Sequence, residues 1–138
     1  MKRMHVGLKV DDLETAIAFY SRLFGAEPTL RRPDYAKWML DDPRVNFSVD
    51  INGGGAPGSA HYGIQVESPH ELSEMRERLD TAGLTRRDQN DLICGYQRQD
   101  KSWVTDPTGN RWEAFYTSGV VEGGGYGMVT VPGDEEEG

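Results

Sequence analysis

Two histidines and one glutamate are the residues of this chain whose types and spacing could do chemistry. His5 begins the segment His-Val-Gly-Leu-Lys-Val, and His61 begins a matching segment, His-Tyr-Gly-Ile-Gln-Val. The two segments lie about 56 residues apart, which indicates two copies of one structural unit. Glu113 lies in an alternating segment near the end of the second copy. Two neutral imidazoles and one carboxylate are a donor set associated with Fe(II), and Mn, Ni or Zn can also use it.

The segments 4–10 and 61–66 alternate in the way that is typical of β-strands. Apolar residues take one face of each strand, so the histidines lie on the other face. A helix should cover each apolar face, and His5 and His61 would then point to the opposite side of the sheet. If the sheet curls around a cavity, His5, His61 and Glu113 can converge there as metal ligands. The alternative is that each histidine is an ordinary polar residue on a half-exposed strand.

Each of these strands is followed by a segment with helical spacing. The first helix is expected over 13–24, with Asp11 or Asp12 as its cap and Gly25 at its end. Its apolar stripe comprises Leu13, Ala16, Ile17, Tyr20, Leu23 and Phe24. The second helix begins with Ser68-Pro69-His70-Glu71, a capping-box pattern, and ends at Gly83. Its buried stripe comprises Leu72, Met75, Leu79 and Ala82.

Three further strands are predicted in each copy. They are expected near 27–31, 34–40 and 44–51, and again near 91–98, 101–105 and 110–117. The predicted fold is α+β, with two tandem βαβββ modules that form a curled mixed sheet around a metal-binding cavity. We expect one domain over 1–121, with module 1 at about 4–52, a Gly-rich linker at 53–59 and module 2 at about 60–117. Residues 122–138 read as a Gly-rich acidic tail.

Composition limits the partners of the chain. Its 138 residues include 15 Lys and Arg against 23 Asp and Glu, a net charge of −8, which argues against nucleic acid or a membrane surface as partner. No run approaches the roughly 20 apolar residues that a membrane span needs, and the N-terminus has no signal-peptide core, so a cytoplasmic location is expected. Cys94 is the single cysteine, and no disulfide can form within the chain.

Two longer motifs carry a family resemblance that covers residues 4–117. One spans the first expected helix and comprises Val10-Asp11-Asp12-Leu13, Phe19-Tyr20 and Leu23-Phe24-Gly25; the other is Asp106-Pro107-Thr108-Gly109-Asn110 with Glu113 after it. Together with the paired modules, they resemble the vicinal oxygen chelate superfamily, which includes glyoxalase I, extradiol dioxygenases, fosfomycin-resistance transferases and bleomycin-binding proteins. The resemblance implies that His5, His61 and Glu113 are metal ligands and that the chain forms a homodimer. Bleomycin-binding members lack these ligands, and glyoxalase I uses a fourth ligand where this chain is expected to have Ser48, which is a poor ligand.

A narrower resemblance concerns the substrate. The segments Arg32-Pro33-Asp34-Tyr35-Ala36 and Cys94-Gly95-Tyr96-Gln97-Arg98-Gln99-Asp100-Lys101-Ser102-Trp103-Val104 are similar to the cadmium-induced protein and arsenic–carbon lyase branch. That resemblance implies an Fe(II)-dependent dioxygenase that uses O2 to cleave the carbon–arsenic bond of trivalent organoarsenicals. Such lyases hold arsenic with two adjacent cysteines, whereas this chain has Cys94 followed by Gly95. The residues that we expect to bind substrate are Cys94, Tyr96, Lys101 and Tyr35.

Each of these interpretations has an alternative. One thiolate binds soft arsenic without the chelate advantage of two, and Cys94 could instead be a small buried residue. Lys101 could be an exposed strand lysine, and Tyr35 and Tyr96 could be packed aromatic residues. At the level of function, the chain could be another metal-dependent member, such as a ring-cleaving dioxygenase or a thiol transferase. It could also be a non-catalytic protein that sequesters a metal or an arsenical.

Overall fold

The computed structural model describes residues 1–126, with the side chains at 95 and 122–126 excepted. The first module contains β1 (Arg3–Lys9), α1 (Leu13–Phe24), β2 (Leu30–Arg32), β3 (Tyr35–Asp41) and β4 (Arg44–Asp50). The second module contains β5 (Ala60–Val66), α2 (Pro69–Thr81), β6 (Arg87–Thr105) and β7 (Arg111–Tyr126).

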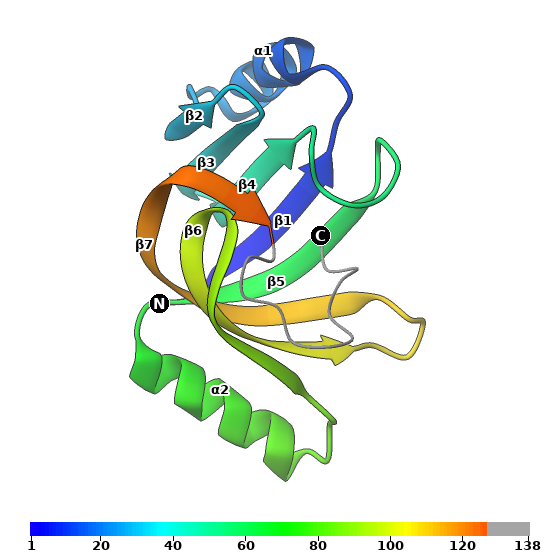
Figure 1. Cartoon of the computed structure of the whole chain (residues 1–138), viewed down its shortest axis with the longest axis vertical. Coiled ribbons are helices and arrows are strands. Elements are labelled where there is room, and N and C mark those ends of the chain that lie inside the picture. The colour runs from blue at the N-terminus through cyan, green and yellow to red at the C-terminus, as the bar shows by residue number, and fades with distance from the viewer. Residues whose placement is uncertain (127–138) are drawn as a thin grey trace.

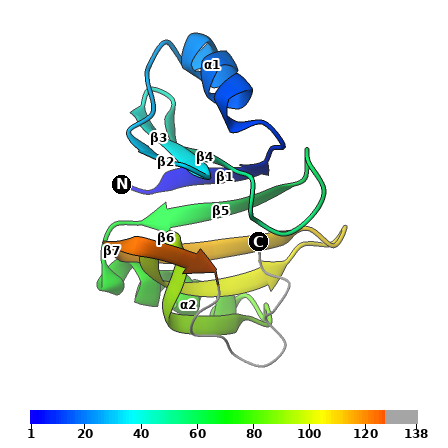
Figure 2. The ribbon, with the colours of Figure 1, turned by 45° about the horizontal axis from the view of Figure 1, so that its top comes forward.

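The strands form one mixed sheet, and the predicted α+β fold with a curled sheet is confirmed. The strand order is β2-β3-β4-β1-β5-β7-β6 in a seven-stranded sheet. The two modules meet at its centre, where β1 and β5 pair antiparallel, while β1 with β4 and β5 with β7 pair parallel. Figures 1 and 2 show the sheet curling, with α1 beside the strands of the first module and α2 beside those of the second.

The helices begin where local sequence predicts. Asp12 caps α1 by accepting a hydrogen bond from the Thr15 N–H, and Gly25 follows the helix in the left-handed region, at φ 67°. Ser68 caps α2 by accepting from the Glu71 N–H at 3.0 Å. The carboxylate of Glu71 accepts from the Glu67 N–H rather than completing a box on Ser68. Among the described residues no helix has the length and apolar character needed to cross a membrane.

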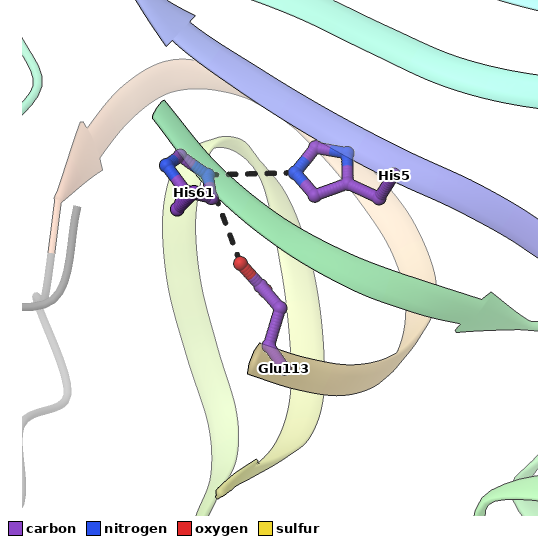
Figure 3. A group of neighbouring side chains, drawn as sticks. All are labelled: His5, His61 and Glu113. Carbon is purple, nitrogen blue, oxygen red and sulfur yellow. Dashed lines mark hydrogen bonds and ion pairs between the residues drawn. The ribbon is translucent and has the colours of Figure 1, made fainter. Parts of the chain in front are cut away.

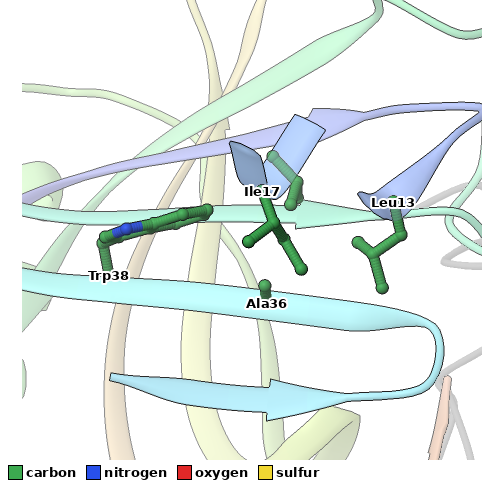
Figure 4. Packing of buried hydrophobic residues seen from close by; sticks show 5 residues of the cluster. Leu13, Ile17, Ala36 and Trp38 are labelled. Carbon is green, nitrogen blue, oxygen red and sulfur yellow. The ribbon is translucent and has the colours of Figure 1, made fainter. Parts of the chain in front are cut away.

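The core of the first module is aromatic and lies between α1 and the sheet. Figure 4 shows Leu13 and Ile17 of α1 against Ala36 and Trp38 of β3. Trp38 is fully buried, and its indole N–H donates to the Ala26 carbonyl at 2.9 Å. Leu23 was expected in this stripe but is 62% exposed, because at 100° per residue it lies at the margin of the helix face that meets the sheet.

The core of the second module is smaller. Its buried members come from β5, α2 and β7, and are Val66, Leu72, Met75 and Ala114. Ala82 is exposed, so the prediction that it belongs to the buried stripe was wrong. The reason is that α2 ends before it, at Thr81, and the chain turns away through Gly83 at φ 76°.

The segment after α2 differs most from the predicted strands. The ribbon of β6 turns back on itself in Figure 1. Ser102 Oγ donates to Asp88 Oδ1 at 2.6 Å, and the Trp103 indole N–H donates to Gln89 Oε1 at 3.0 Å, so the two arms lie side by side and the reversal falls near residue 95. The sequence predicted two separate strands, near 91–98 and 101–105. The structure instead has one strand, β6, that begins at Arg87 and runs to Thr105, so the predicted start at 91 and the predicted break between 98 and 101 were wrong. The first arm begins at Arg87 with polar residues, whose burial depends on partners in the second arm.

The last strand is longer than predicted. β7 continues beyond 117 to Tyr126, and its end pairs with the reversal of β6, with Cys94 opposite Tyr126 and Gly95 opposite Gly125. Residues 122–126 are thus strand rather than tail. The pairing of β6 with β7 contains two register shifts in this region. The sequence did not predict the extension because glycines are weak strand formers. The remainder of the predicted tail, 127–138, lies outside the described residues.

Candidate metal centre

His5, His61 and Glu113 come from three neighbouring strands and point toward one another (Figure 3). One donor atom from each residue lies within 4.8 Å of the other two. The Nε2 atoms of the two histidines are 3.4 Å apart, and His61 Nε2 is 3.7 Å from Glu113 Oε2. The predicted convergence is confirmed, and the group could hold a metal ion.

Strand register explains why these three residues meet. His5 lies opposite Gly63 and His61 lies opposite Gly7 in the antiparallel β1–β5 pair. Gly63 is also paired with Glu113 across the parallel β5–β7 ladder. Residues opposite each other in adjacent strands project to the same side of a sheet. All three side chains therefore emerge on the concave face, away from the helices.

The two glycines make the approach of these side chains possible. A Cβ atom at Gly7 would lie 2.5 Å from His61 Nε2, and a Cβ atom at Gly63 would lie 2.5 Å from the Glu113 carbonyl oxygen. Both distances are far below van der Waals contact. The packing of His61 and Glu113 therefore requires glycine at both positions.

His5 is held in a state suited to metal binding. Its Nδ1 lies 3.1 Å from the carbonyl oxygen of Asn46, which can only accept, so Nδ1 carries the hydrogen and Nε2 keeps its lone pair. The ring packs edge-on against Phe115 at 5.1 Å between centroids. Burial lowers the pKa of His5 to about 4, more than the attraction of Glu113 raises it, so the imidazole is neutral at pH 7.

Glu113 is ionised although it is only 3% exposed. Burial by itself would raise the pKa of Glu113, but the charge of Lys101, followed by the two histidines, lowers it below its usual value. Lys101 Nζ donates to Glu113 Oε1 at 2.9 Å, which leaves Oε2 directed at His61. Lys101 is itself 1% exposed, so the alternative that it is an exposed strand lysine was wrong. Its contact with substrate stays a prediction.

The donor set fits a divalent transition metal. Two imidazole nitrogens and one carboxylate oxygen lie within 4.8 Å of one another, as a three-ligand site with open positions requires. Ser48 is opposite Gly7 in the first module, just as Glu113 is opposite Gly63 in the second. The register therefore confirms Ser48 as the counterpart of Glu113, and this position offers a hydroxyl in place of a fourth strong ligand.

A cavity of about 300 Å³ opens beside His61. Lys9 and Asp50 line it together with the glycine-rich loop 53–55, Trp103, Asn110 and Arg111. Lys9 donates to the Gly53 carbonyl and Asp50 accepts from the Gly53 N–H, so the loop between the modules is tied to the cavity wall. Burial raises the pKa of Asp50. Sequence reasoning missed both residues, although Lys9 shares the strand face of His5.

Three of the predicted substrate residues lie near the reversal of β6. Tyr35 of β3 is 6% exposed, and its ring centroid is 5.8 Å from that of Tyr96. The Tyr96 hydroxyl donates to Asp34 Oδ1 at 2.6 Å. Burial raises the pKa of Tyr35, and Cys94 raises it further. The half-buried Cys94 therefore lies near the Tyr35 hydroxyl. The structure brings Cys94, Tyr35 and Tyr96 together, and their binding of substrate stays a prediction.

Known proteins share this sequence pattern and fold. A sequence profile of the Glyoxalase/Bleomycin resistance protein/Dioxygenase superfamily matches residues 2–114. The chain is 47% identical, over 88% of its length and 77% of the relative, to a trivalent organoarsenical cleaving enzyme of Bacillus sp. (strain MD1). It is 42% identical, over 83% of its length and 76% of the relative, to the cadmium-induced protein CadI of Mycobacterium bovis.

Solved structures resemble the fold at low sequence identity. A variant of homoprotocatechuate 2,3-dioxygenase from B. fuscum has a TM-score of 0.61 at 18% identity, covering 88% of this chain and 34% of that one. The Mn(II)-bound glyoxalase from Novosphingobium aromaticivorans has a TM-score of 0.55 at 17% identity, covering 91% of this chain and 42% of that one. At these identities the likeness concerns the fold alone.

Proposed function

Because the chain belongs to the Glyoxalase/Bleomycin resistance protein/Dioxygenase superfamily, we propose that it is an Fe(II)-dependent, dioxygenase-type lyase that cleaves the carbon–arsenic bond of trivalent organoarsenicals. The observation that carries the proposal is the group of His5, His61 and Glu113, whose donor atoms lie within 4.8 Å of one another. The arsenical substrate is supported by the relatives named trivalent organoarsenical cleaving enzymes, at 47% and 39% identity.

In this proposal, His5, His61 and Glu113 would hold the metal ion, and Mn, Ni or Zn could use the same donors. Fe(II) bound there would supply the oxygen-dependent redox chemistry of the reaction. Lys101 holds one oxygen of Glu113 and leaves the other toward His61. The buried face around His5 and Phe115 excludes water from one side of the site. Cys94 would bind the arsenic through its thiolate, and Tyr35 and Tyr96 would line the same region.

Metal analysis tests the site. We expect the purified protein to bind about one Fe(II) per chain, and His5→Ala and His61→Ala each to weaken this binding by at least about 100-fold, because each removes one of three ligands. His70→Ala is the matched control, since His70 is 84% exposed on α2 and pairs only with Glu74 among the described residues. Full iron occupancy and turnover in His5→Ala would show that the site assignment is wrong.

The arsenical reaction is tested by demethylation of methylarsenite in air. We expect release of inorganic arsenite by the iron-loaded wild type and a large loss in Cys94→Ala, with iron content unchanged. An inactive iron-loaded wild type would contradict the lyase while leaving the metal site intact. Activity that persists in Cys94→Ala would remove the thiolate from the proposal.

Sequestration of a metal or an arsenical is a second candidate, favoured by the 42% identity to the cadmium-induced protein CadI. Oxygen uptake by the iron-loaded protein separates the two functions. A lyase consumes O2 when methylarsenite is added, whereas a sequestering protein binds the arsenical and consumes none. A homodimer and a cytoplasmic location are also part of the proposal, and gel filtration and cell fractionation would test them.

A further inference from the structure

The Glu113 carboxylate presents its two oxygens to different neighbours. Oε1 accepts a hydrogen bond from Lys101 Nζ at 2.9 Å, whereas Oε2 is 3.7 Å from His61 Nε2. A carboxylate can bind a metal ion through one oxygen or through both. The contact at Oε1 therefore bears on how many coordination positions Glu113 would take, and the inference rests on the metal site of the proposed function.

Lys101 is held beside Oε1 by its surroundings. In the β6–β7 pair Lys101 lies opposite Phe115, two residues beyond Glu113. Diagonal neighbours of this kind share one face of a sheet and are within reach of long side chains. Lys101 Nζ is 5.3 Å from the centroid of the Trp103 ring and 5.9 Å from that of Phe115. The ammonium group is thus enclosed by two rings and a carboxylate, and Lys101 is only 1% exposed.

The Glu113 side chain has little room to turn its carboxylate over. A Cβ atom at Gly63 would lie 2.6 Å from Glu113 Cγ, so this side chain lies directly on the backbone of β5. Trp103 is opposite Glu113 on the other side, across the β6–β7 pair. Separating the buried charges of Glu113 and Lys101 is strongly unfavourable. Oε1 therefore stays with Lys101 when Oε2 serves as a ligand.

We propose that Lys101 is a positioning residue that restricts Glu113 to a ligand with one oxygen. Two imidazole nitrogens and one carboxylate oxygen then leave about three positions of a six-coordinate ion for ligands that enter from the cavity beside His61. Without Lys101, Oε1 would bind the same ion and take one of these positions. Lys101 acts through Glu113 in this role, which needs no contact with substrate.

This role predicts a change opposite in sign to that of structural damage. If Lys101 only supported the fold, its removal would loosen Glu113, and water would replace a lost protein ligand. If Lys101 restricts Glu113, its removal lets a second protein oxygen replace a water molecule. The number of water molecules on the bound ion therefore separates the two roles.

Mn(II) is the probe, because it accepts nitrogen and oxygen donors and its effect on the relaxation of water protons reports how many water molecules it holds. We expect about three on Mn(II) in the full-length wild type and about two in Lys101→Met, which keeps most of the side-chain length and removes the donor. Lys9→Met is the matched control, because Lys9 lines the same cavity but donates to the Gly53 carbonyl instead of Glu113. It should keep the wild-type number.

An unchanged or larger number of water molecules in Lys101→Met would overturn the inference and leave the metal site standing. A wild type that binds neither Mn(II) nor Fe(II) would contradict the proposed function itself. If circular dichroism shows that Lys101→Met is unfolded, infrared difference spectra of the wild type with and without Mn(II) replace it, because the two carboxylate stretching bands lie closer together for a two-oxygen ligand. A narrow separation would overturn the inference, and the wide separation of a one-oxygen ligand would support it.

Discussion

The two modules share a topology, but the first surrounds a buried tryptophan with aromatic rings, whereas the second buries an ion pair. In the first module, Trp38 is surrounded by Tyr20, Phe24 and Phe47, with ring centroids 5.8 to 6.2 Å from its own. In the second, the fully buried pair is Lys101 with Glu113. The comparison indicates that duplication let one half serve as an apolar support while the other half acquired the electrostatics of the site.

The candidate metal ligands also differ between the two modules. His5 of the first module is 8% exposed and is fixed by the carbonyl oxygen of Asn46. The His61 side chain of the second module is 27% exposed and lines the cavity. At equivalent register positions the first module has Ser48 and the second has Glu113. The first half therefore contributes a rigid ligand at the back of the site, and the second contributes the ligand at its mouth and the carboxylate.

The largest expected effect separates Glu113 from Ser48. Glu113→Ala leaves Lys101 buried without its counter-charge, and we expect a loss of about 3–5 kcal/mol in the free energy of unfolding, measured with urea on the metal-free protein. Ser48→Ala should cost only about 1 kcal/mol. Replacing Glu113 by Leu and Lys101 by Met together should cost less than Glu113→Ala alone. Equal losses at Glu113 and Ser48 would contradict the contrast between the modules.

The next effect compares the two cores. Trp38→Ala removes a fully buried ring and its hydrogen bond to Ala26, and should cost about 4 kcal/mol. Met75→Ala in the smaller core should cost about 2 kcal/mol, because fewer buried groups surround it. Both values are measured by urea denaturation. If the Met75 variant loses as much as the Trp38 variant, the first module is not the main support.

A smaller effect concerns acid stability at the turn between β6 and β7. Although burial alone would raise the pKa of Asp106, hydrogen bonds from Asn110, Trp112 and Thr108 lower it from 3.8 to about 2. Because the folded pKa is the lower one, this contribution to stability is complete above about pH 4 and is lost as the pH falls toward 2. Unfolding free energies measured from pH 5 to 2 should therefore fall less steeply in Asp106→Asn. Parallel curves would contradict the assignment.

The smallest effect is expected at Leu23, in comparison with Leu79 on the other helix. Leu23 of α1 is 62% exposed, whereas Leu79 of α2 is 9% exposed. Leu23→Ala should change the free energy of unfolding by less than about 0.5 kcal/mol, and Leu79→Ala should lower it by about 2 kcal/mol or more. Thermal melts of the two variants are sufficient. A large loss at Leu23 would show that its face is covered in solution.

The sequence was most informative where structure depends on local or periodic features. The caps at Asp12 and Ser68 act within one helical turn, so residue types are enough to place them. The repeat and strand alternation were enough to predict that His5, His61 and Glu113 share one face of the sheet, and the register of β1, β5 and β7 then brings them together. The donor types of these residues indicated a metal site, and the family resemblance supported the same interpretation.

The pairing of strands that lie far apart in the chain could not be predicted from the sequence. The burial of Lys101 depends on the register between β6 and β7, which places it within reach of Glu113. The first arm of β6 is polar, and its buried Gln89 is held by the Trp103 indole, so no apolar period marks it as a strand. The identity of the metal, the substrate and the oligomeric state stay predictions.

Gly7 has a consequence for how this chain can change through evolution. It belongs to the first module, but the ring that occupies the space above it, His61, belongs to the second. Any mutation that adds a side chain there damages a ligand encoded far along the gene, while its own half still folds. Selection must therefore act on the two halves jointly, and the first half could be exchanged for the matching half of a distant relative only if that half also has a glycine at this position.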